Sequence, residues 1–421
     1  MEFIVYTSDL KRYATGLCAY GVCKALGEKG HRVHIINLDQ DKSTTREGNV
    51  IIHNVEKDLV RRSILKLSEK KMQLGVKLLK FLLRIIIQIK AIFTLVPVLS
   101  CHKKLINRTI EVLNNHNCDM IVAVVNPMES IMAAKYISNN YNIPYCAYYL
   151  DSIFGNNGIR VLSNNTFKKK ALKFEEQYLS GAKKVFMMRS AKGMYKSFGF
   201  GETSFNEKII YVDIPLLKVE EKYNPHPFEY WDKNQIVILY VGTMPKNIRR
   251  PHYALALIDR VAQDNVHFYI AGQTDYGELI DEYIRKNHNI HYLGYVNHDQ
   301  VRSLLMDATV LLNIGNSIDT MIPSKIFEYM SYGKPIISTQ KIKSDKTSSY
   351  LGLYGNALIV DENESLTDSI DNVISFIRKS SMSQNNGLQE LKELCTFNGP
   401  LYSNTPECIS NYLETVIVQK E

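Results

Sequence analysis

Short, continuous apolar runs alternate with stretches of helical periodicity along most of this 421-residue chain. Apolar runs without a polar face, separated by helices, are typical of parallel strands that are buried on both sides of a sheet. In the N-terminal half the pattern predicts a helix near 13–29 and strands at 2–7, 32–38, 119–125, 144–150 and 184–189. This half is therefore predicted to be an α/β domain with a doubly wound sheet.

The same pattern restarts after residues 217–234, where two prolines and alternating charges interrupt it. Strands are expected at 235–242, 266–272, 290–295, 309–315, 335–339 and 357–361. Helices are expected near 251–264, 276–287, 298–308, 324–332, 365–379 and 404–418. The second half is thus predicted to be another doubly wound α/β domain.

The chain is longer than one hydrophobic core usually supports, so two domains are expected. The predicted boundaries are 1–217 and 235–400 for two Rossmann-like domains, with a linker at 218–234. The helix in 401–421 is expected to pack back across the cleft between the domains. Ligands of doubly wound sheets bind at the carboxyl ends of the strands, so the site is expected where those ends face the cleft.

Composition places the protein in the globular class, with 45% hydrophobic and 22% charged residues. Its seven cysteines include no CxxC pair, which argues against a disulfide framework and a cysteine zinc site. The first apolar run is too short for a secretion signal and lacks a basic start. These features favour a reducing, cytoplasmic location.

Positive charge is concentrated in one segment. Residues 60–104 contain eleven Lys or Arg and a single acid, Glu69, although the whole chain has a net charge of only +8. This local excess favours one anionic surface partner over general nucleic-acid binding.

Within that segment, residues 74–99 read as a helix with Lys77, Lys80 and Arg84 on one face and aliphatic residues around the rest. The charges recur too often for a transmembrane span. Two interpretations remain open: an amphipathic helix lying on an anionic membrane surface, or a buried helix whose basic side chains reach solvent.

The strongest candidate chemistry lies in the stretch MIPSKIFEYMSYGKPII, residues 321–337. Ser324 is a suitable N-cap for a helix that begins there. Lys325 opposes the helix dipole at that position, which makes sense if an anion such as a diphosphate binds beside it. Glu328 shares the same helical face and could accept hydrogen bonds from vicinal ribose hydroxyls. An exposed Lys–Glu pair without function is the alternative.

This segment resembles the P-x-K-x-x-E-x-x-x-x-G-x-P signature of GT-B glycosyltransferases of the family-4, or group 1, kind. The stretches YVGTMPKNIRR (240–250) and NIHYLGYVNHDQVRSLLMDATVLLNIG (289–315) follow the order of that family, and the resemblance covers nearly the whole chain. It implies a GT-B fold with a nucleotide-diphosphate sugar held mainly by the second domain and an acceptor held by the first.

The resemblance also assigns expected roles by position. Glu328 would bind the ribose, and Lys325 with Arg249 or its neighbour Arg250 would bind the diphosphate, whose developing charge Arg249 would stabilise. The remaining donor-site positions would be Gly16 at the first helix start of the acceptor domain, Gly242 at the strand end, Tyr295 after the strand residues IHYLG, and Ser324.

On the acceptor side, the resemblance implies that Asp151 stands where the family usually has a histidine at a strand end, and Asp151 would position or deprotonate the acceptor hydroxyl. A loop or N-cap role for Asp151 is the alternative. The second glutamate that many family members use to hold the donor sugar is Thr320 here, next to Asp319, so neither the sugar nor the stereochemical outcome is predicted. Without a DxD triplet or clustered His and Cys residues, we expect neither a metal nor a cofactor.

The leading hypothesis is therefore a metal-independent, hexosyl-type glycosyltransferase. The basic segment favours a lipid-linked glycan acceptor at the inner face of the cell membrane. The resemblance to the family implies a role in bacterial capsule, O-antigen or exopolysaccharide synthesis. A GT-B-fold nucleotide-sugar 2-epimerase is the alternative enzyme. A two-lobed solute-binding protein is less favoured because the chain shows no export signal.

Overall fold

The computed structural model describes the chain except residues 11–12, 71, 99–100, 126, 151–152, 154–158, 160, 220–230, 233, 247, 317–323, 343–344, 383–386 and 419–421. The side chains of Glu69, Gln73 and His298 are also outside the description. The chain divides into two compact units. Unit 1 comprises Met1–Pro215 and Pro406–Glu421, and unit 2 comprises Leu216–Thr405.

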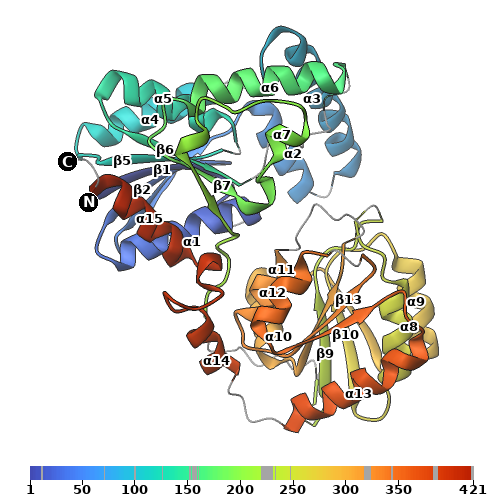
Figure 1. Ribbon diagram of the computed structural model, residues 1–421. Helices are drawn as coiled ribbons and strands as arrows, with labels where there is room; N and C mark the ends of the chain where they lie inside the picture. Colours follow the sequence, from blue (N-terminus) through green and yellow to red (C-terminus); the bar gives the residue numbers. More distant parts are fainter. Residues whose placement is uncertain are drawn as a thin grey trace. The chain divides into compact units, whose positions relative to one another are not determined.

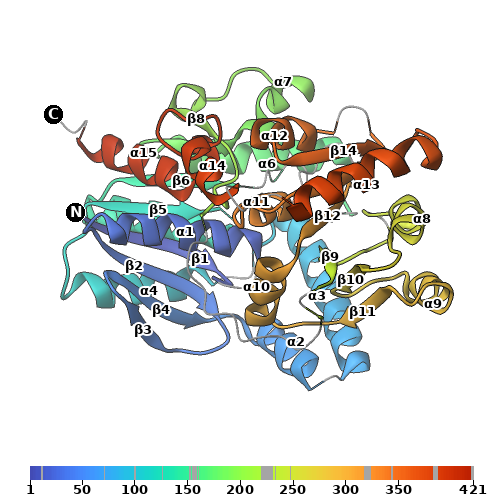
Figure 2. The same cartoon turned by 90° about the horizontal axis from the view of Figure 1, so that it is seen from below.

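Unit 1 is built on an eight-stranded sheet of order β3-β4-β2-β1-β5-β6-β7-β8, part of which is seen in Figure 2. Its strands are β1 Glu2–Ser8, β2 Arg32–Asp39, β3 Thr44–Glu47, β4 Val50–Glu56, β5 Met120–Val124, β6 Tyr145–Tyr149, β7 Val185–Met188 and β8 Ile209–Val212. All neighbours are parallel except the edge pair β3 and β4. The central strands β5 and β6 are buried along their whole length, as their continuous apolar sequence requires.

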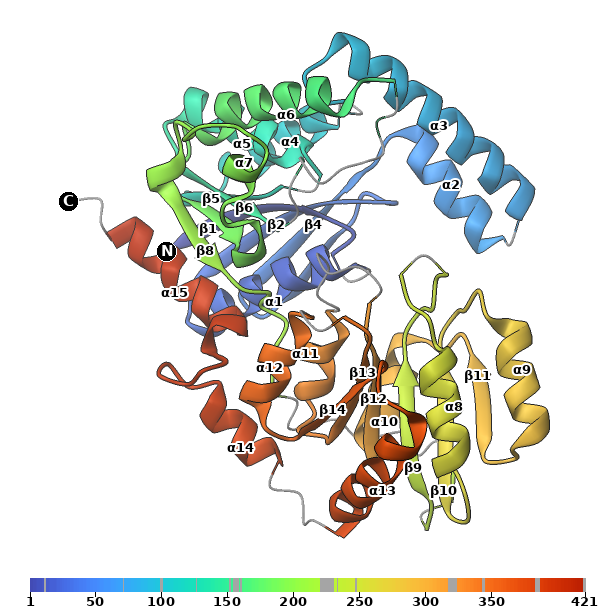
Figure 3. The same cartoon turned by 45° about the vertical axis from the view of Figure 1, so that its right-hand side comes forward.

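Helices cover both faces of this sheet. They are α1 Ala14–Glu28, α2 Leu59–Glu69, α3 Gln73–Phe93, α4 His102–Leu113, α5 Glu129–Tyr141, α6 Asn164–Leu179, α7 Met194–Ser197 and α15 Pro406–Val418. One core packs the sheet against apolar residues of α4, α5 and α6, and the other packs it against α1 and α15. Helices α2 and α3 lie side by side as a hairpin that projects from the rest of unit 1 (Figure 3).

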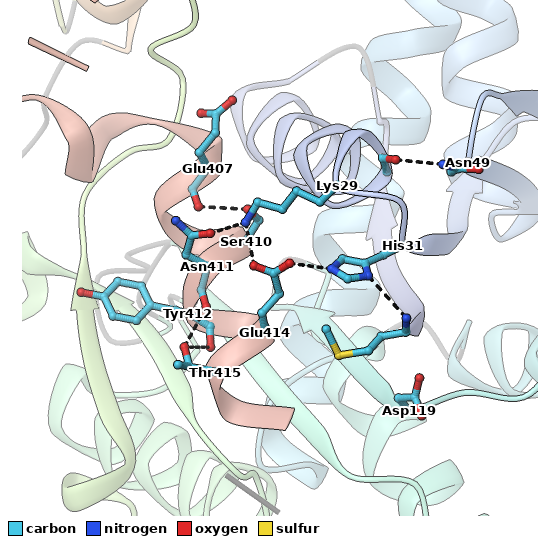
Figure 4. Close-up of polar contacts among 12 residues, drawn as sticks. Lys29, His31, Asn49, Asp119, Glu407, Ser410, Asn411, Tyr412, Glu414 and Thr415 are labelled. Carbon is cyan, nitrogen blue, oxygen red and sulfur yellow. Dashed lines mark hydrogen bonds and ion pairs between the residues drawn. The ribbon is translucent and has the colours of Figure 1, made fainter. Parts of the chain in front are cut away.

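The C-terminal helix α15 returns to unit 1, where it packs against α1. Ile409 and Leu413 enter the same core as α1. Glu414 joins the two elements by polar contacts, with one carboxylate oxygen 2.7 Å from Lys29 Nζ and the other 2.5 Å from His31 Nε2 (Figure 4). Unit 1 is therefore completed by a segment that is remote in sequence.

Unit 2 is a six-stranded parallel sheet of order β11-β10-β9-β12-β13-β14. Its strands are β9 Ile236–Val241, β10 Val266–Ala271, β11 Ile290–Gly294, β12 Val310–Ile314, β13 Ile336–Gln340 and β14 Ala357–Asp361. Its helices are α8 His252–Val261, α9 Gly277–Lys286, α10 His298–Asp307, α11 Lys325–Met330, α12 Thr347–Tyr354, α13 Leu366–Met382 and α14 Gly387–Leu394. Helices α8, α9 and α13 pack on one face, while α10, α11 and α12 lie on the other (Figure 1).

The predicted α/β fold with two doubly wound sheets is confirmed, and every strand that was expected is present. The pattern missed β3, β4, β8, α2 and α4 in unit 1, as well as α12 and α14 in unit 2. The unit boundaries differ from the expected ones. Unit 1 ends at Pro215 and resumes at Pro406, so the described residues of the expected linker belong to unit 2.

Candidate functional site

The carboxyl edge of the unit 2 sheet is shaped by glycines at the ends of three neighbouring strands. Gly242, Gly272 and Gly294 follow or end β9, β10 and β11, and each has a positive φ angle. A Cβ atom on Gly272 would lie 2.0 Å from the carbonyl oxygen of Gly242. Only glycine therefore allows the backbones at the ends of β9 and β10 to approach this closely, and no side chains cover these strand ends.

Arg249 is fixed over the end of β9. A turn after the strand brings it back, with the Arg249 N–H donating to the carbonyl of Pro245 at 3.0 Å. Its guanidinium donates from Nη1 to the Thr243 carbonyl at 2.9 Å and from Nε to Asn316 Oδ1 at 3.2 Å. Of the two arginines predicted for the diphosphate, Arg249 is half-buried at this edge, whereas the side chain of Arg250 is exposed.

Tyr329 ties α11 to the same strand end. Its hydroxyl donates to the carbonyl of Val241 at 2.9 Å and accepts from the N–H of Val241 at 2.8 Å. The side chain is 1% exposed. Burial raises the pKa of Tyr329 above its ordinary range, as does the nearby negative charge of Glu328, whereas Arg249 acts in the opposite direction.

Lys325 and Glu328 form an ion pair on the first turn of α11, with Nζ 2.5 Å from Oε2. Both side chains are half-buried. Ser324 occupies the N-cap position of α11, as expected, but its side chain makes no capping hydrogen bond. Ser324 has helical backbone angles there, and an N-cap side chain reaches back to the helix only from an extended residue.

Tyr295 lies at the same carboxyl edge, directly after β11, and is 77% exposed. It is three strands away from the α11 side of the sheet in the order β11-β10-β9-β12. The expected donor residues of unit 2 are therefore brought to one edge of one sheet from three segments that are far apart in sequence, 242–250, 295 and 324–328.

In unit 1, Gly16 lies in the first turn of α1. A Cβ atom there would meet the Asp9 carbonyl oxygen at 2.5 Å and backbone atoms of Leu10 at 2.9 Å. This close approach requires glycine and offers a structural reason for the residue, beside any contact with a donor. Asp9 itself has φ of 50° and forms a buried ion pair with Lys57 at 2.5 Å.

Several positions predicted for the site lie outside the described residues. These are Asp151, the acceptor-side candidate, and the pair Asp319 and Thr320. The strand that precedes Asp151, β6, ends at Tyr149, so its carboxyl end is the expected place for an acceptor-binding loop.

Lys77, Lys80 and Arg84 are all exposed on α3. The alternative of a buried α3 is wrong, because much of its apolar surface is exposed as well. The exposed apolar residues are Leu74, Leu78, Phe81, Leu82, Ile85, Ile86, Ile89, Ile92 and Phe93. Among the described helices, none is long and apolar enough to cross a membrane.

Sequence reasoning overlooked residues that support the site but have no catalytic role of their own. Tyr329 holds α11 to the end of β9, and Asn316 accepts a hydrogen bond from Arg249. Tyr240, also buried, places its hydroxyl near Arg249. Gly272 could have been found from the sequence, because Gly242 and Gly272 each directly follow an apolar run that predicts a strand. The contacts of Tyr329 and Asn316 had no signal, because they depend on how strands and helices assemble.

Residues 235–375 match the family described as glycosyl transferases group 1. The chain is similar in structure to sucrose-phosphate synthase from Thermosynechococcus elongatus, with 10% identity over 100% of this chain and 99% of that chain and a TM-score of 0.61. No curated protein has significant sequence similarity to it.

Two further structures are similar over nearly their whole length. HepE of Anabaena in complex with UDP has 12% identity over 99% of this chain and 100% of that chain, with a TM-score of 0.58. The lipopolysaccharide outer core galactosyltransferase WaaB has 13% identity over 98% and 100%, with a TM-score of 0.52. At these identities the similarity establishes the fold, which is GT-B.

Proposed function

We propose that this protein transfers a sugar, of the hexosyl type, from a nucleotide-diphosphate sugar to a hydroxyl of a lipid-linked glycan. Its product would serve the assembly of a bacterial surface polysaccharide, such as a capsule, an O-antigen or an exopolysaccharide. The observation that carries the proposal is the Lys325–Glu328 pair on the helix that Tyr329 fastens to the end of β9, where Arg249 is also anchored.

The ion pair would be exchanged when the donor binds. Glu328 would turn its carboxylate to the ribose hydroxyls, and Lys325 would be released toward the diphosphate. Both groups are half-buried, so their interaction with the ligand is screened less than at an open surface. The complex of HepE with UDP supports a nucleotide in a fold of this kind.

In the transfer step, the bond between the anomeric carbon and the diphosphate oxygen breaks, and the acceptor oxygen forms a bond to that carbon. The electron pair of the broken bond stays on the diphosphate, where the cations of Arg249 and Lys325 would offset its charge. These two residues would replace a metal ion in that role. The proton of the acceptor hydroxyl would pass to a base on the acceptor side, for which Asp151 is the candidate.

The lipid-linked acceptor is proposed because α3 has the properties of a peripheral membrane anchor. Its exposed apolar residues form one side of the helix, and Lys77, Lys80 and Arg84 flank them. The helix contains no acidic residue. This combination suits the interface of an anionic bilayer, where apolar side chains enter the acyl boundary and basic ones meet the head groups.

Two polar residues of α3, Lys90 and Gln88, interrupt its apolar sequence, but both make hydrogen bonds within unit 1. Lys90 donates to the carbonyl of Val98 at 2.8 Å, and Gln88 Oε1 accepts the N–H of Val161 at 2.9 Å. Lys170 of α6 donates to the carbonyls of Ala91 and Ile92, both at 2.7 Å, and so holds the end of α3 to the body of unit 1. The helix is anchored through these contacts while its apolar side stays exposed.

The donor site can be tested by thermal-shift measurements with UDP, GDP, ADP and TDP and their sugars. We expect at least one nucleotide to stabilise wild type and to lose most of that effect with Glu328→Ala or Arg249→Ala. The matched control is Glu282→Ala, which breaks an exposed Lys–Glu pair of the same 2.5 Å length on α9. If no nucleotide stabilises wild type, or if Glu328→Ala responds as the control does, the proposed donor site is refuted.

A further inference from the structure

Glu2, His34 and His116 bring three potential metal ligands together in unit 1. Glu2 Oε1 lies 2.9 Å from His34 Nε2 and 3.1 Å from His116 Nδ1. The ligand atoms of the three residues all lie within 4.8 Å of one another. In the described part of the chain, this is the one group of at least three His, Cys, Asp or Glu side chains so arranged.

The fold, and no local motif, creates this cluster. Glu2 begins β1, and His34 lies on the adjacent strand β2, where it pairs in register with Ile4. His116 lies in the turn between α4 and β5. The Asp119 carboxylate fixes this corner by accepting the N–H of Glu2 at 2.8 Å. The cluster thus lies at the amino ends of the strands, opposite the carboxyl edge where doubly wound sheets bind their substrates.

A chain of hydrogen bonds from Arg108 through His53 reaches His34 Nδ1, the ring nitrogen that faces away from Glu2. A guanidinium can only donate, so Arg108 Nη2 donates to His53 Nδ1 at 3.1 Å. His53 Nε2–H then donates to His34 Nδ1 at 3.0 Å, and His34 Nε2–H donates to Glu2. The proton on His34 Nε2 therefore occupies the position that a cation would take. With a cation there, His34 would carry its proton on Nδ1 and donate it to His53 Nε2, the outer-shell contact typical of histidine ligands. His53 would then carry its own proton on Nδ1, so Arg108 Nη2 would have to give up that nitrogen and keep its bond to Thr44 Oγ1 at 2.7 Å.

We propose that Glu2, His34 and His116 bind a divalent transition-metal cation, for which Zn²⁺ is the best fit. Two imidazoles and one carboxylate, with a fourth position left to water, form a ligand set that suits Zn²⁺. His34 is 1% exposed, whereas Glu2 and His116 are more accessible and leave a path for entry.

The charges around the site set the expected strength of binding. Arg32 Nη1 lies 3.5 Å from Glu2 Oε1 and would have to share that carboxylate with the cation. Arg108 approaches only the far side of the chain of hydrogen bonds, through His53. Three ligands beside one competing guanidinium favour moderate affinity. The cation would fasten the start of β1, strand β2 and the turn before β5 to one another, which is a structural role separate from sugar transfer.

The proposal can be tested by calorimetric titration of chelator-treated protein with Zn²⁺, together with thermal unfolding. We expect one Zn²⁺ per chain, a rise in melting temperature that EDTA reverses, and at least about tenfold weaker binding in His116→Ala and in Glu2→Gln. Co²⁺ should give a visible spectrum of a nitrogen and oxygen site without thiolate charge transfer. Circular dichroism checks that each variant is folded, and Glu2→Gln keeps the shape of the side chain if His116→Ala does not fold.

The matched control is His291→Ala. His267 and His291 form a second stacked imidazole pair, with Nδ1 and Nε2 3.1 Å apart, on β10 and β11. Within the described residues, that pair is not part of a three-ligand group. Its loss should leave Zn²⁺ binding unchanged. The proposal is overturned if wild type binds no Zn²⁺, or if both site variants bind it as wild type does, which would indicate adventitious surface binding only.

Discussion

Replacing Lys77, Lys80 and Arg84 by glutamate is expected to detach the protein from anionic membranes. Each basic residue close to an anionic bilayer contributes about 1 kcal/mol of attraction, so neutralising three removes about 3 kcal/mol. Reversing their charge adds repulsion of similar size. Because 1.4 kcal/mol is a factor of ten, binding to anionic vesicles should fall by at least about a hundredfold.

The apolar side of α3 should contribute a comparable amount. Leu78, Phe81, Ile85 and Ile89 are 59%, 59%, 40% and 52% exposed. Full burial of such a side chain is worth about 1.5–3 kcal/mol, so burying the exposed half of each gives about 1 kcal/mol per residue. Charge and burial are therefore of similar weight. Replacing Leu78, Phe81 and Ile85 by serine should also abolish binding, whereas neither variant should alter nucleotide binding by unit 2.

Flotation with phosphatidylcholine vesicles, with and without 30% phosphatidylglycerol, measures the electrostatic and the apolar contribution to membrane binding. Wild type should float with the anionic vesicles and lose much of this binding in high salt. The control is Arg260, Arg285 and Lys286→Glu, which makes the same change in net charge on exposed residues of α8 and α9. The reasoning is refuted if wild type stays unbound, if the α3 charge variant floats as wild type does, or if the control loses binding equally.

Three further changes probe the interior of the two units. Tyr329→Phe removes both hydrogen bonds to Val241 and should destabilise unit 2 by about 1–3 kcal/mol in urea unfolding, with weaker nucleotide binding; unchanged stability would contradict this. Gly272→Ala should destabilise unit 2 severely, because its Cβ would collide with Gly242, and a near-normal melting temperature would show that the strand ends can separate. Burial raises the pKa of Glu175 to about 8, so the folded state keeps a proton that the unfolded state releases near pH 4.5. Stability should be highest at the acid end of this range and fall by up to about 1.4 kcal/mol per pH unit toward pH 8. Glu175→Gln should flatten this dependence in urea titrations at pH 5.5 and 8, and an equal slope in both proteins would contradict the assignment.

The sheets could be read from the sequence because their central strands are buried on both faces. Runs such as those of β5 and β9 have no polar side and cannot be confused with surface strands. The edge strand β3 is exposed along its length and carries the sequence TTRE, so hydrophobicity gives no signal for it. Helix α12 was also missed, because its polar and apolar residues show almost no helical segregation.

The candidate site was partly predictable for a different reason. Lys325 and Glu328 stand out at a helix start, whereas Gly242 and Arg249 were assigned through the resemblance to GT-B glycosyltransferases, and the roles of all four stay predictions. Arg249 could not be separated from Arg250, since only the turn after β9 decides which guanidinium reaches Thr243 and Asn316.

By itself, the sequence determined the two doubly wound sheets, the positions of their buried strands, the segment of concentrated basic charge and the charged start of α11. These are properties of local pattern, because burial and helix ends leave their period and their residue types in the chain. Only the tertiary structure decided that the apolar side of α3 is exposed, that α15 completes unit 1, and that Glu2, His34 and His116 share one corner. Each of these depends on contacts between residues far apart in sequence, for which no local period exists.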